Sequence, residues 1–171
     1  MDIVSLALIL SRITECHVSG GESLSEAMDI YSFSRMQVAR RKISEAANLL
    51  RSREADLEAL DSREVDFHCA MTHKRARDSA LALRIWERLA QGLRRDKVAQ
   101  LSRIELAKYF EHKTREFERA LSYTEEVIRL NAGETIFAKD NMSSNEFTEE
   151  LLHRSRRLCF KIERLKSPLS A

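Results

Sequence analysis

Two side chains that commonly bind metal ions stand at helical spacing in this sequence. Cys69 and His73 are four residues apart, so on a helix they would lie on one side and could share an ion. Two ligands on one helix still need partners from elsewhere in the chain, and no such partner is recognisable from spacing. We therefore expect no metal ion and no other cofactor, with structural roles for both residues.

Histidine also serves in acid-base and nucleophilic catalysis. His112 and His153 stand without a recognisable serine or cysteine nucleophile. A histidine near the C-terminal end of a helix is a common partner of the helix dipole. The sequence therefore predicts structural roles for these histidines and no catalytic residue in the chain.

A basic segment close to the end of the chain carries a local excess of positive charge. Its cations could contact phosphates, in which case binding would be independent of base sequence and sensitive to salt. The alternative is a solvated helix face with its cations near the helix C-terminus. The candidates for phosphate contact are Arg154, Arg156, Arg157 and Lys161.

The elements that position these residues are predicted to be helices. The chain of 171 residues contains four glycines and one proline, and these fall between apolar-periodic segments or near the end. Those segments are rich in Ala, Leu, Arg, Glu and Lys, which favour helices. The sequence therefore predicts an all-α fold.

The composition limits the kinds of partner and the cellular compartment that we expect for this protein. Lys plus Arg number 29 and Asp plus Glu 27, so the net charge of +2 does not indicate a dedicated polyanion binder. Cys16, Cys69 and Cys159 form no C-x-x-C pair, which fits thiols in a reducing cytoplasm. The apolar stretch over residues 3–10 is shorter than the roughly 20 residues that span a bilayer. We expect a cytoplasmic protein without a membrane partner.

The periodicity predicts one helical-repeat domain over residues 1–171. A first helix covers residues 1–17, three helix pairs cover 23–130, a loop covers 131–145 and a capping helix covers 146–166. The first helices of the pairs are predicted over residues 25–39, 62–73 and 96–112, and their partners over 43–55, 78–91 and 116–130. Ser23 with Glu26, and Ser143 with Glu146, have the spacing of capping boxes.

A small residue followed four positions later by a bulkier one recurs in the second helices. These pairs are Ala46 and Leu50, Ala82 and Trp86, and Ala120 and Thr124. The alanines are 36 and 38 residues apart, close to the tetratricopeptide period of about 34. Seven positions after each alanine, Leu89 and Val127 fit an apolar stripe and Arg53 does not. The pattern predicts a right-handed, tetratricopeptide-like stack of antiparallel helix pairs.

The last helix is predicted to cap this stack with an apolar inner face and a polar outer one. The inner face would consist of Leu151, Leu152, Leu158, Ile162 and Leu165.

Several segments resemble one known family. IELAKYFEHKTREFERALSYTEEV (residues 104–127), the tryptophan-bearing ALALRIWERLA and the basic HRSRRLCFKIERL are similar to the tetratricopeptide-like tail of the YprB-like proteins, a bacterial family of ribonuclease H-like 3′ to 5′ exonucleases. LAKYFEHK is the most telling run. The resemblance covers most of the chain and implies the tail of such an exonuclease without its catalytic domain.

The resemblance extends to the first residues. Asp2-Ile3-Val4-Ser5-Leu6 looks like the last motif of the exonuclease domain, whose aspartate ligates a catalytic metal. Two-metal hydrolysis needs several convergent carboxylates, and the others would precede Met1. Asp2 is therefore either a remnant metal ligand or an ordinary N-terminal helix cap, and in neither case would it catalyse a reaction here.

These observations leave three functional interpretations open. The first is a non-catalytic interaction module that binds a protein, a peptide, a nuclease domain or nucleic acid in a groove. The groove candidates are Arg35, Lys74, Lys108 and His112. The second is the C-terminal part of a metal-dependent exonuclease that is active only with its catalytic domain, and the third is a decayed reading frame. Fold analogy alone does not decide between them.

Overall fold

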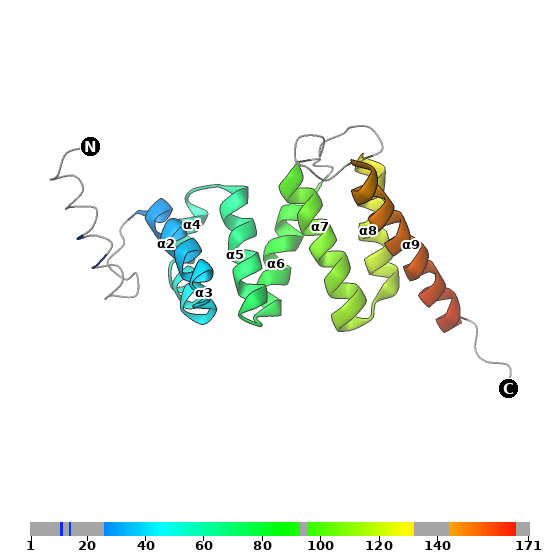
Figure 1. Cartoon of the computed structure of the whole chain (residues 1–171), viewed down its shortest axis with the longest axis horizontal. Coiled ribbons are helices and arrows are strands. Elements are labelled where there is room, and N and C mark those ends of the chain that lie inside the picture. Colours follow the sequence, from blue (N-terminus) through cyan, green and yellow to red (C-terminus); the bar gives the residue numbers. More distant parts are fainter. Residues whose placement is uncertain (1–10, 12–13, 15–25, 93–95, 132–143, 167–171) are drawn as a thin grey trace. The chain divides into compact units, whose positions relative to one another are not determined.

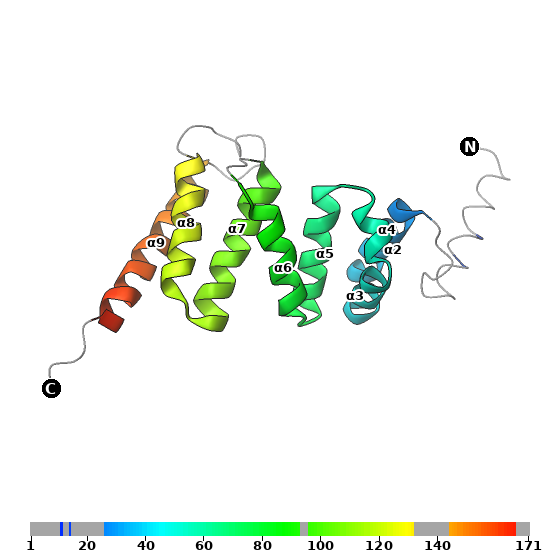
Figure 2. The ribbon, with the colours of Figure 1, turned by 180° about the vertical axis from the view of Figure 1, so that it is seen from behind.

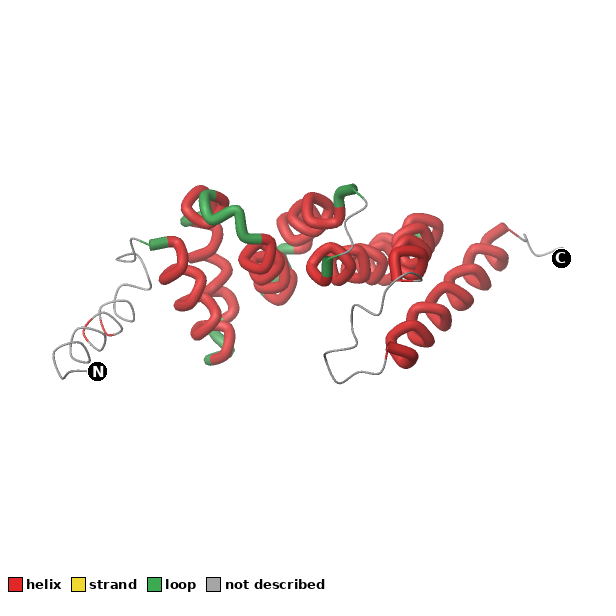
Figure 3. Tube along the Cα trace, turned by 90° about the horizontal axis from the view of Figure 1, so that it is seen from above, coloured by secondary structure: helices red, strands yellow, loops and turns green. Residues whose placement is uncertain are grey.

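The described part of the protein is built from helices. The computed structural model describes residues 26–92, 96–131 and 144–166 and the single positions 11 and 14, and every regular element in these ranges is helical (Figure 3). The all-α expectation is thus confirmed for these residues. Asp2, Cys16, Ser23, Ser143 and, apart from positions 11 and 14, the predicted helix over residues 1–17 lie outside the described part.

Contacts divide the chain into two compact units, Met1–Ala82 and Leu83–Ala171. In the first unit, α2 (Ala27–Ala39) packs on α3 (Ile43–Ser52), and α3 also contacts α5 (Arg63–Arg75), while the short α4 (Glu54–Glu58) contacts all three (Figure 1). Helix α6 (Ser79–Ala90) begins in the first unit and continues into the second. The core of the first unit comprises Ile30, Phe33, Ala46, Leu49, Leu50, Leu57, Val65 and Ala70.

The second unit holds α7 (Lys97–Tyr109), the π-helical turn η1 (Phe110–Thr114), α8 (Phe117–Asn131) and α9 (Ser144–Lys166). Helices α7 and α8 run antiparallel, and α9 packs along α8 (Figure 2). Asp96 caps α7, because its carboxylate accepts a hydrogen bond of 2.9 Å from the Ala99 amide. Ile104, Val127 and Leu151 bring α7, α8 and α9 into one apolar cluster.

The predicted pairs of small and bulky residues lie in the core. Ala46, Ala82 and Ala120 are completely buried, and so nearly are Leu50, Trp86 and Thr124. Leu89 and Val127 are buried as well, whereas Arg53 is partly exposed. Helical periodicity therefore predicted the buried positions of α3, α6 and α8 correctly.

A further repeat appears in the backbone just before these alanines. Arg41, Arg77 and Arg115 adopt the left-handed conformation, with φ of 63°, 67° and 59°. Each lies in a short turn, respectively between α2 and α3, α5 and α6, and η1 and α8, and each precedes its buried alanine by five residues. Left-handed residues are rare outside glycine, so three at one register mark three equivalent turns.

Hydrogen bonds show how alike the first two turns are. The amides of Arg41 and Arg77 each donate to a carbonyl three residues earlier, and those of Lys42 and Asp78 each donate to a carbonyl five residues earlier. This is the Schellman pattern of helix termination. In the third turn, Glu116 donates to Phe110, six residues earlier, because η1 accommodates one more residue.

Two predicted helices are interrupted in the structure. The segment 43–55 was expected as one helix, but α3 ends at Ser52, whose hydroxyl donates to the carbonyl of Leu49, and α4 then brings Leu57 into the core. The segment 96–112 was also expected as one helix, but its last residues form η1, which buries Phe110 and Glu111. A continuous 3.6-residue pattern predicted neither break.

The inner face of α9 also differs from its prediction. Leu151 and Leu158 are buried and Ile162 is partly buried, but Leu152 and Leu165 are exposed. Residue 152 lies one step around the helix from residue 151, so both cannot occupy the centre of one narrow stripe. Arg154, three residues after Leu151 and four before Leu158, takes a place on the buried side instead.

Candidate functional site

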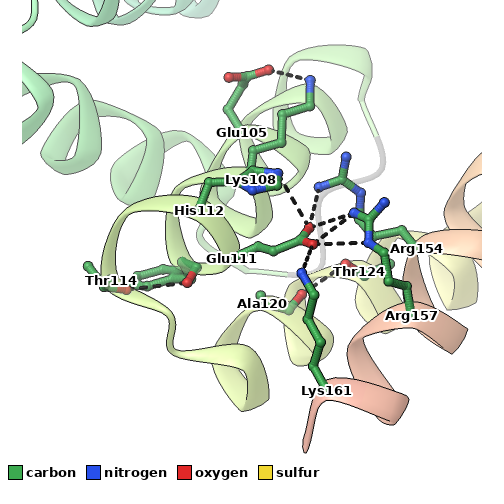
Figure 4. A network of polar contacts seen from close by, with 11 residues as sticks. Glu105, Lys108, Glu111, His112, Thr114, Ala120, Thr124, Arg154, Arg157 and Lys161 are labelled. Carbon is green, nitrogen blue, oxygen red and sulfur yellow. Dashed lines mark hydrogen bonds and ion pairs between the residues drawn. The ribbon is translucent and has the colours of Figure 1, made fainter.

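The carboxylate of Glu111 is the centre of a polar network in the second unit. Glu111 lies in η1, and its side chain is 0% exposed. The π-helical turn orients it toward α9 rather than toward solvent (Figure 4). A buried carboxylate is costly unless it is paired and hydrogen-bonded, so its partners decide what this site can do.

Three cations of α9 supply those partners. Arg157 donates to both carboxylate oxygens, from Nε at 3.1 Å and from Nη2 at 2.9 Å. Lys161 donates from Nζ at 2.8 Å, and Nη1 of Arg154 lies 3.4 Å away (Figure 4). Residues 154, 157 and 161 share one face of a helix, so a single helix can direct all three at one acceptor.

The electrostatic balance favours the ionised carboxylate. Burial raises the pKa of Glu111, but hydrogen bonds from Lys161 and Arg157 and their positive charges outweigh burial and hold the pKa below its ordinary value. Three cations and one carboxylate leave a formal excess of two positive charges. Arg157 is 40% exposed and Lys161 35% exposed, so part of this excess faces solvent.

The structure therefore brings together residues that sequence analysis had placed in two separate sets. Arg154, Arg157 and Lys161 were candidates for phosphate contact, and all three bind Glu111. Arg156 is exposed and takes no part in this network. His112, a groove candidate, is exposed, with Nε2 3.7 Å from Oε2 of Glu111.

Lys108, another groove candidate, lies beside this network. Its Nζ donates to Oε1 of Glu105 at 2.7 Å, one turn earlier on α7 (Figure 4). Glu105 is buried, so Lys108 neutralises a second buried carboxylate of the second unit. The phosphate and groove assignments of these residues remain predictions, but most of their charges already have a partner within the protein.

The groove candidates of the first unit have different surroundings. Arg35 lies over the ring of Tyr31, 5.6 Å from its centroid. The rings of Tyr31 and His68 are perpendicular, with their centroids 5.2 Å apart. Nε2 of His68 is 3.1 Å from the hydroxyl of Ser34. Burial, followed by the positive charges of Arg35 and Arg75, lowers the pKa of His68 from 6.5 to about 4. Lys74 is exposed on α5.

The cysteine and histidine expected to have structural roles are both buried. His73 has a pKa lowered chiefly by burial, which the charge of Asp78, 3.9 Å away, partly opposes. Asp78 also accepts hydrogen bonds from Arg51 and from the amide of Leu81, so it joins α3, α5 and the start of α6. Within the described ranges, no three His, Cys, Asp or Glu side chains are grouped so as to hold a metal ion.

Sequence reasoning assigned no role to Glu111. The available signal was indirect: three cations lie on one face of a helix that also carries leucines, and an acidic partner is one of several groups that such cations can meet. Nothing in the sequence says which of the many glutamates this is, because 46 residues separate Glu111 from Arg157.

Comparison with known proteins gives one similarity. The chain is 29% identical over 129 residues to an uncharacterized protein of Bacillus subtilis (strain 168), YprB. The match covers 75% of this chain, which spans about 30% of the length of YprB. No family model matches the chain, and no solved structure matches it. No described helix has the length and apolar character needed to cross a membrane.

Proposed function

We propose that this chain is a non-catalytic, tetratricopeptide-like interaction module that acts as the accessory C-terminal part of a ribonuclease H-like exonuclease system. One observation carries the helical-repeat part of this proposal. The left-handed residues Arg41, Arg77 and Arg115 each precede a completely buried alanine by five positions, so turn and close helix contact recur together. Their spacings of 36 and 38 residues are near the tetratricopeptide period of about 34.

The distribution of buried charge supports a scaffold. The buried side chain of Glu111 binds α9, and buried Arg103 donates to the Gly92 carbonyl and pairs with Glu126 on α8 at 3.0 Å. These groups hold helices together: Glu111 joins η1 to α9, and Arg103 joins α7 to α8. Stacked helical repeats present extended surfaces to their partners, so charge that is used between helices supports a scaffold role.

The link to an exonuclease system rests on similarity. The YprB-like resemblance of residues 104–127 and the 29% identity to YprB favour a common origin of the helical segment. A second candidate function is the C-terminal part of a metal-dependent exonuclease that is active only with its catalytic domain. The observation that favours it is that the chain spans only about 30% of YprB.

The first experiment incubates the purified chain with labelled single-stranded and double-stranded DNA and RNA in the presence of Mg²⁺ or Mn²⁺. We expect no hydrolysis. The same chain is then mixed with the portion of YprB outside the matched segment, and complex formation is measured by light scattering after size exclusion. A complex supports the accessory role. Metal-dependent hydrolysis by the chain alone that survives Asp2→Ala would contradict it.

The coding DNA separates the two candidates. Read in all three frames, the DNA upstream of Met1 is expected to encode a ribonuclease H-like body, with a D-x-E motif and a Tyr or His a few residues before Asp2. If that body is in frame, the exonuclease reading is favoured, and nuclease activity should be compared with and without the helical segment. An unrelated gene there would leave a free-standing adaptor as the better description.

A further inference from the structure

A pocket of about 430 Å³ opens in the second unit where the start of α8 meets the end of α9. Its apolar lining comes from Phe117, Ile162 and Leu165. Leu165 is 70% exposed, so part of this apolar lining faces solvent. Pockets of several hundred Å³ that combine apolar lining with a few polar groups are typical ligand sites.

The charged lining of the pocket is almost balanced. Arg119 pairs with Glu116 at 2.8 Å, and Lys166 pairs with Glu118 at 2.8 Å. Arg115 is the remaining charged residue of the lining, and within the described residues no carboxylate pairs with its guanidinium. The pocket therefore offers one unneutralised positive charge beside apolar surface.

The turn fixes the backbone from which this charge projects. Arg115 is the left-handed residue between the end of η1 and the start of α8. Lys161 lies over the ring of Phe117, 5.2 Å from the centroid, and its Nζ is held by Glu111. The network around Glu111 thus supports one wall of the pocket and covers a face of the aromatic ring.

We propose that this pocket binds a peptide segment in which an apolar side chain stands next to a carboxylate. The apolar side chain would occupy the space beside Phe117, Ile162 and Leu165, and the carboxylate would pair with Arg115. A nucleic-acid strand fits less well, because two of the three cations in the lining are already paired and Lys161 covers the ring of Phe117. This proposal rests on the interaction role proposed above and names the chemistry of its partner.

The test uses fluorescein-labelled peptides with the full chain. One set carries a central Leu, Ile, Phe or Trp flanked by Glu, and matched sets carry Gln or Lys as flanks. Fluorescence anisotropy is expected to show binding of the Glu-flanked peptides, about three- to fivefold tighter than of the Gln-flanked peptides, because one partly exposed ion pair is added. Equal binding of the Lys-flanked set would overturn the proposal.

Protein variants locate the binding site. Arg115→Asn removes the guanidinium but tolerates the left-handed backbone, so it should weaken binding of the Glu-flanked peptides about threefold to fivefold while leaving the fold intact. The matched control is Arg77→Asn, which alters an arginine of the same conformation in the first unit. Leu165→Ser should weaken binding of every apolar peptide, whereas Leu152→Ser, at another exposed leucine of α9, should not.

Further outcomes separate this proposal from its alternatives. A pocket occupied by a second copy of the chain would give a dimer in sedimentation that Leu165→Ser dissociates, and a labelled oligo-dT strand that binds in an Arg115-dependent manner would assign the pocket to nucleic acid. Either result overturns the peptide proposal. The chain could also bind the YprB portion equally well with and without Arg115→Asn, and bind no peptide. That result would reject the peptide site in this pocket and still support the proposed function.

Discussion

The guanidinium of Arg157 donates from Nε and Nη2 to the two carboxylate oxygens of Glu111, at 3.1 and 2.9 Å, across 46 residues of sequence. Two parallel bonds between planar groups fix orientation as well as distance. This pair, with Lys161 and Arg154, attaches α9 to η1, beside the apolar cluster that joins α9 to α7 and α8.

Glu111→Gln should destabilise the second unit by about 2 to 3 kcal/mol. The amide carries no negative charge to offset the three cations, and the loss stays below that of a wholly buried pair because Arg157 and Lys161 are partly exposed. Urea unfolding followed by the fluorescence of Trp86, the one tryptophan of the chain, measures this change. Glu118→Gln, at an exposed carboxylate of α8 that also pairs with a lysine of α9, is the matched control and should leave the midpoint unchanged within error.

Stability of the first unit should fall as pH decreases from 6.5 to about 4. The pKa of His68 is lowered from 6.5 to about 4, so in this window the unfolded chain binds a proton that the folded chain does not. The contribution of this group is fully present above pH 6.5 and is lost toward pH 4, with a slope of up to about 1.4 kcal/mol per pH unit. His68→Gln should reduce that slope and leave the part contributed by His73, whose pKa burial also lowers.

Ala82→Leu should destabilise the protein by about 1 to 3 kcal/mol, because a larger side chain at a completely buried position forces overpacking. Ala80→Leu, two residues earlier on the exposed side of α6, is the control. Thermal unfolding followed by circular dichroism compares the two. An unchanged melting temperature for Ala82→Leu would show that the assigned repeat register is wrong.

Arg77→Gly should stabilise the protein by about 0.5 to 1 kcal/mol. A left-handed residue with a Cβ is strained, and glycine relieves that strain at some cost in the entropy of the unfolded chain. Arg77→Val should be destabilising, because a β-branched residue resists positive φ. Chemical denaturation of both variants checks the order. If valine were tolerated as well as glycine, the turn would not require this conformation.

Phosphate contact by α9 remains a prediction that salt titration can test. If it occurs, affinity for a labelled oligo-dT strand must fall steeply as salt rises. Because Arg154 and Arg157 are engaged by Glu111, Arg156→Gln is the informative variant, and it should lower the slope of log affinity against log salt by about 0.7. An affinity that does not change with salt would show that Arg156 lies on a solvated face and that Arg154 and Arg157 have a structural role.

The sequence by itself determined the helices, the turns between them and the buried small residues. These features depend on neighbours within one or two helical turns, so periodicity, scarce glycine and the recurrence of Ala46, Ala82 and Ala120 were sufficient. The same local logic failed at residue 53 and at Phe110, where burial of Leu57 and of Glu111 outweighs the preference for a continuous helix.

The site was decided by the tertiary structure. The inward side of α9 depends on the partner across the interface, and for that reason Arg154 is buried while Leu165 is exposed beside the pocket. A basic helix has the same charge pattern whether its cations meet phosphate, water or a carboxylate from another helix. Only the folded chain brings Glu111 within 3.4 Å of Arg154, Arg157 and Lys161, because a long-range contact leaves no periodic trace in the sequence.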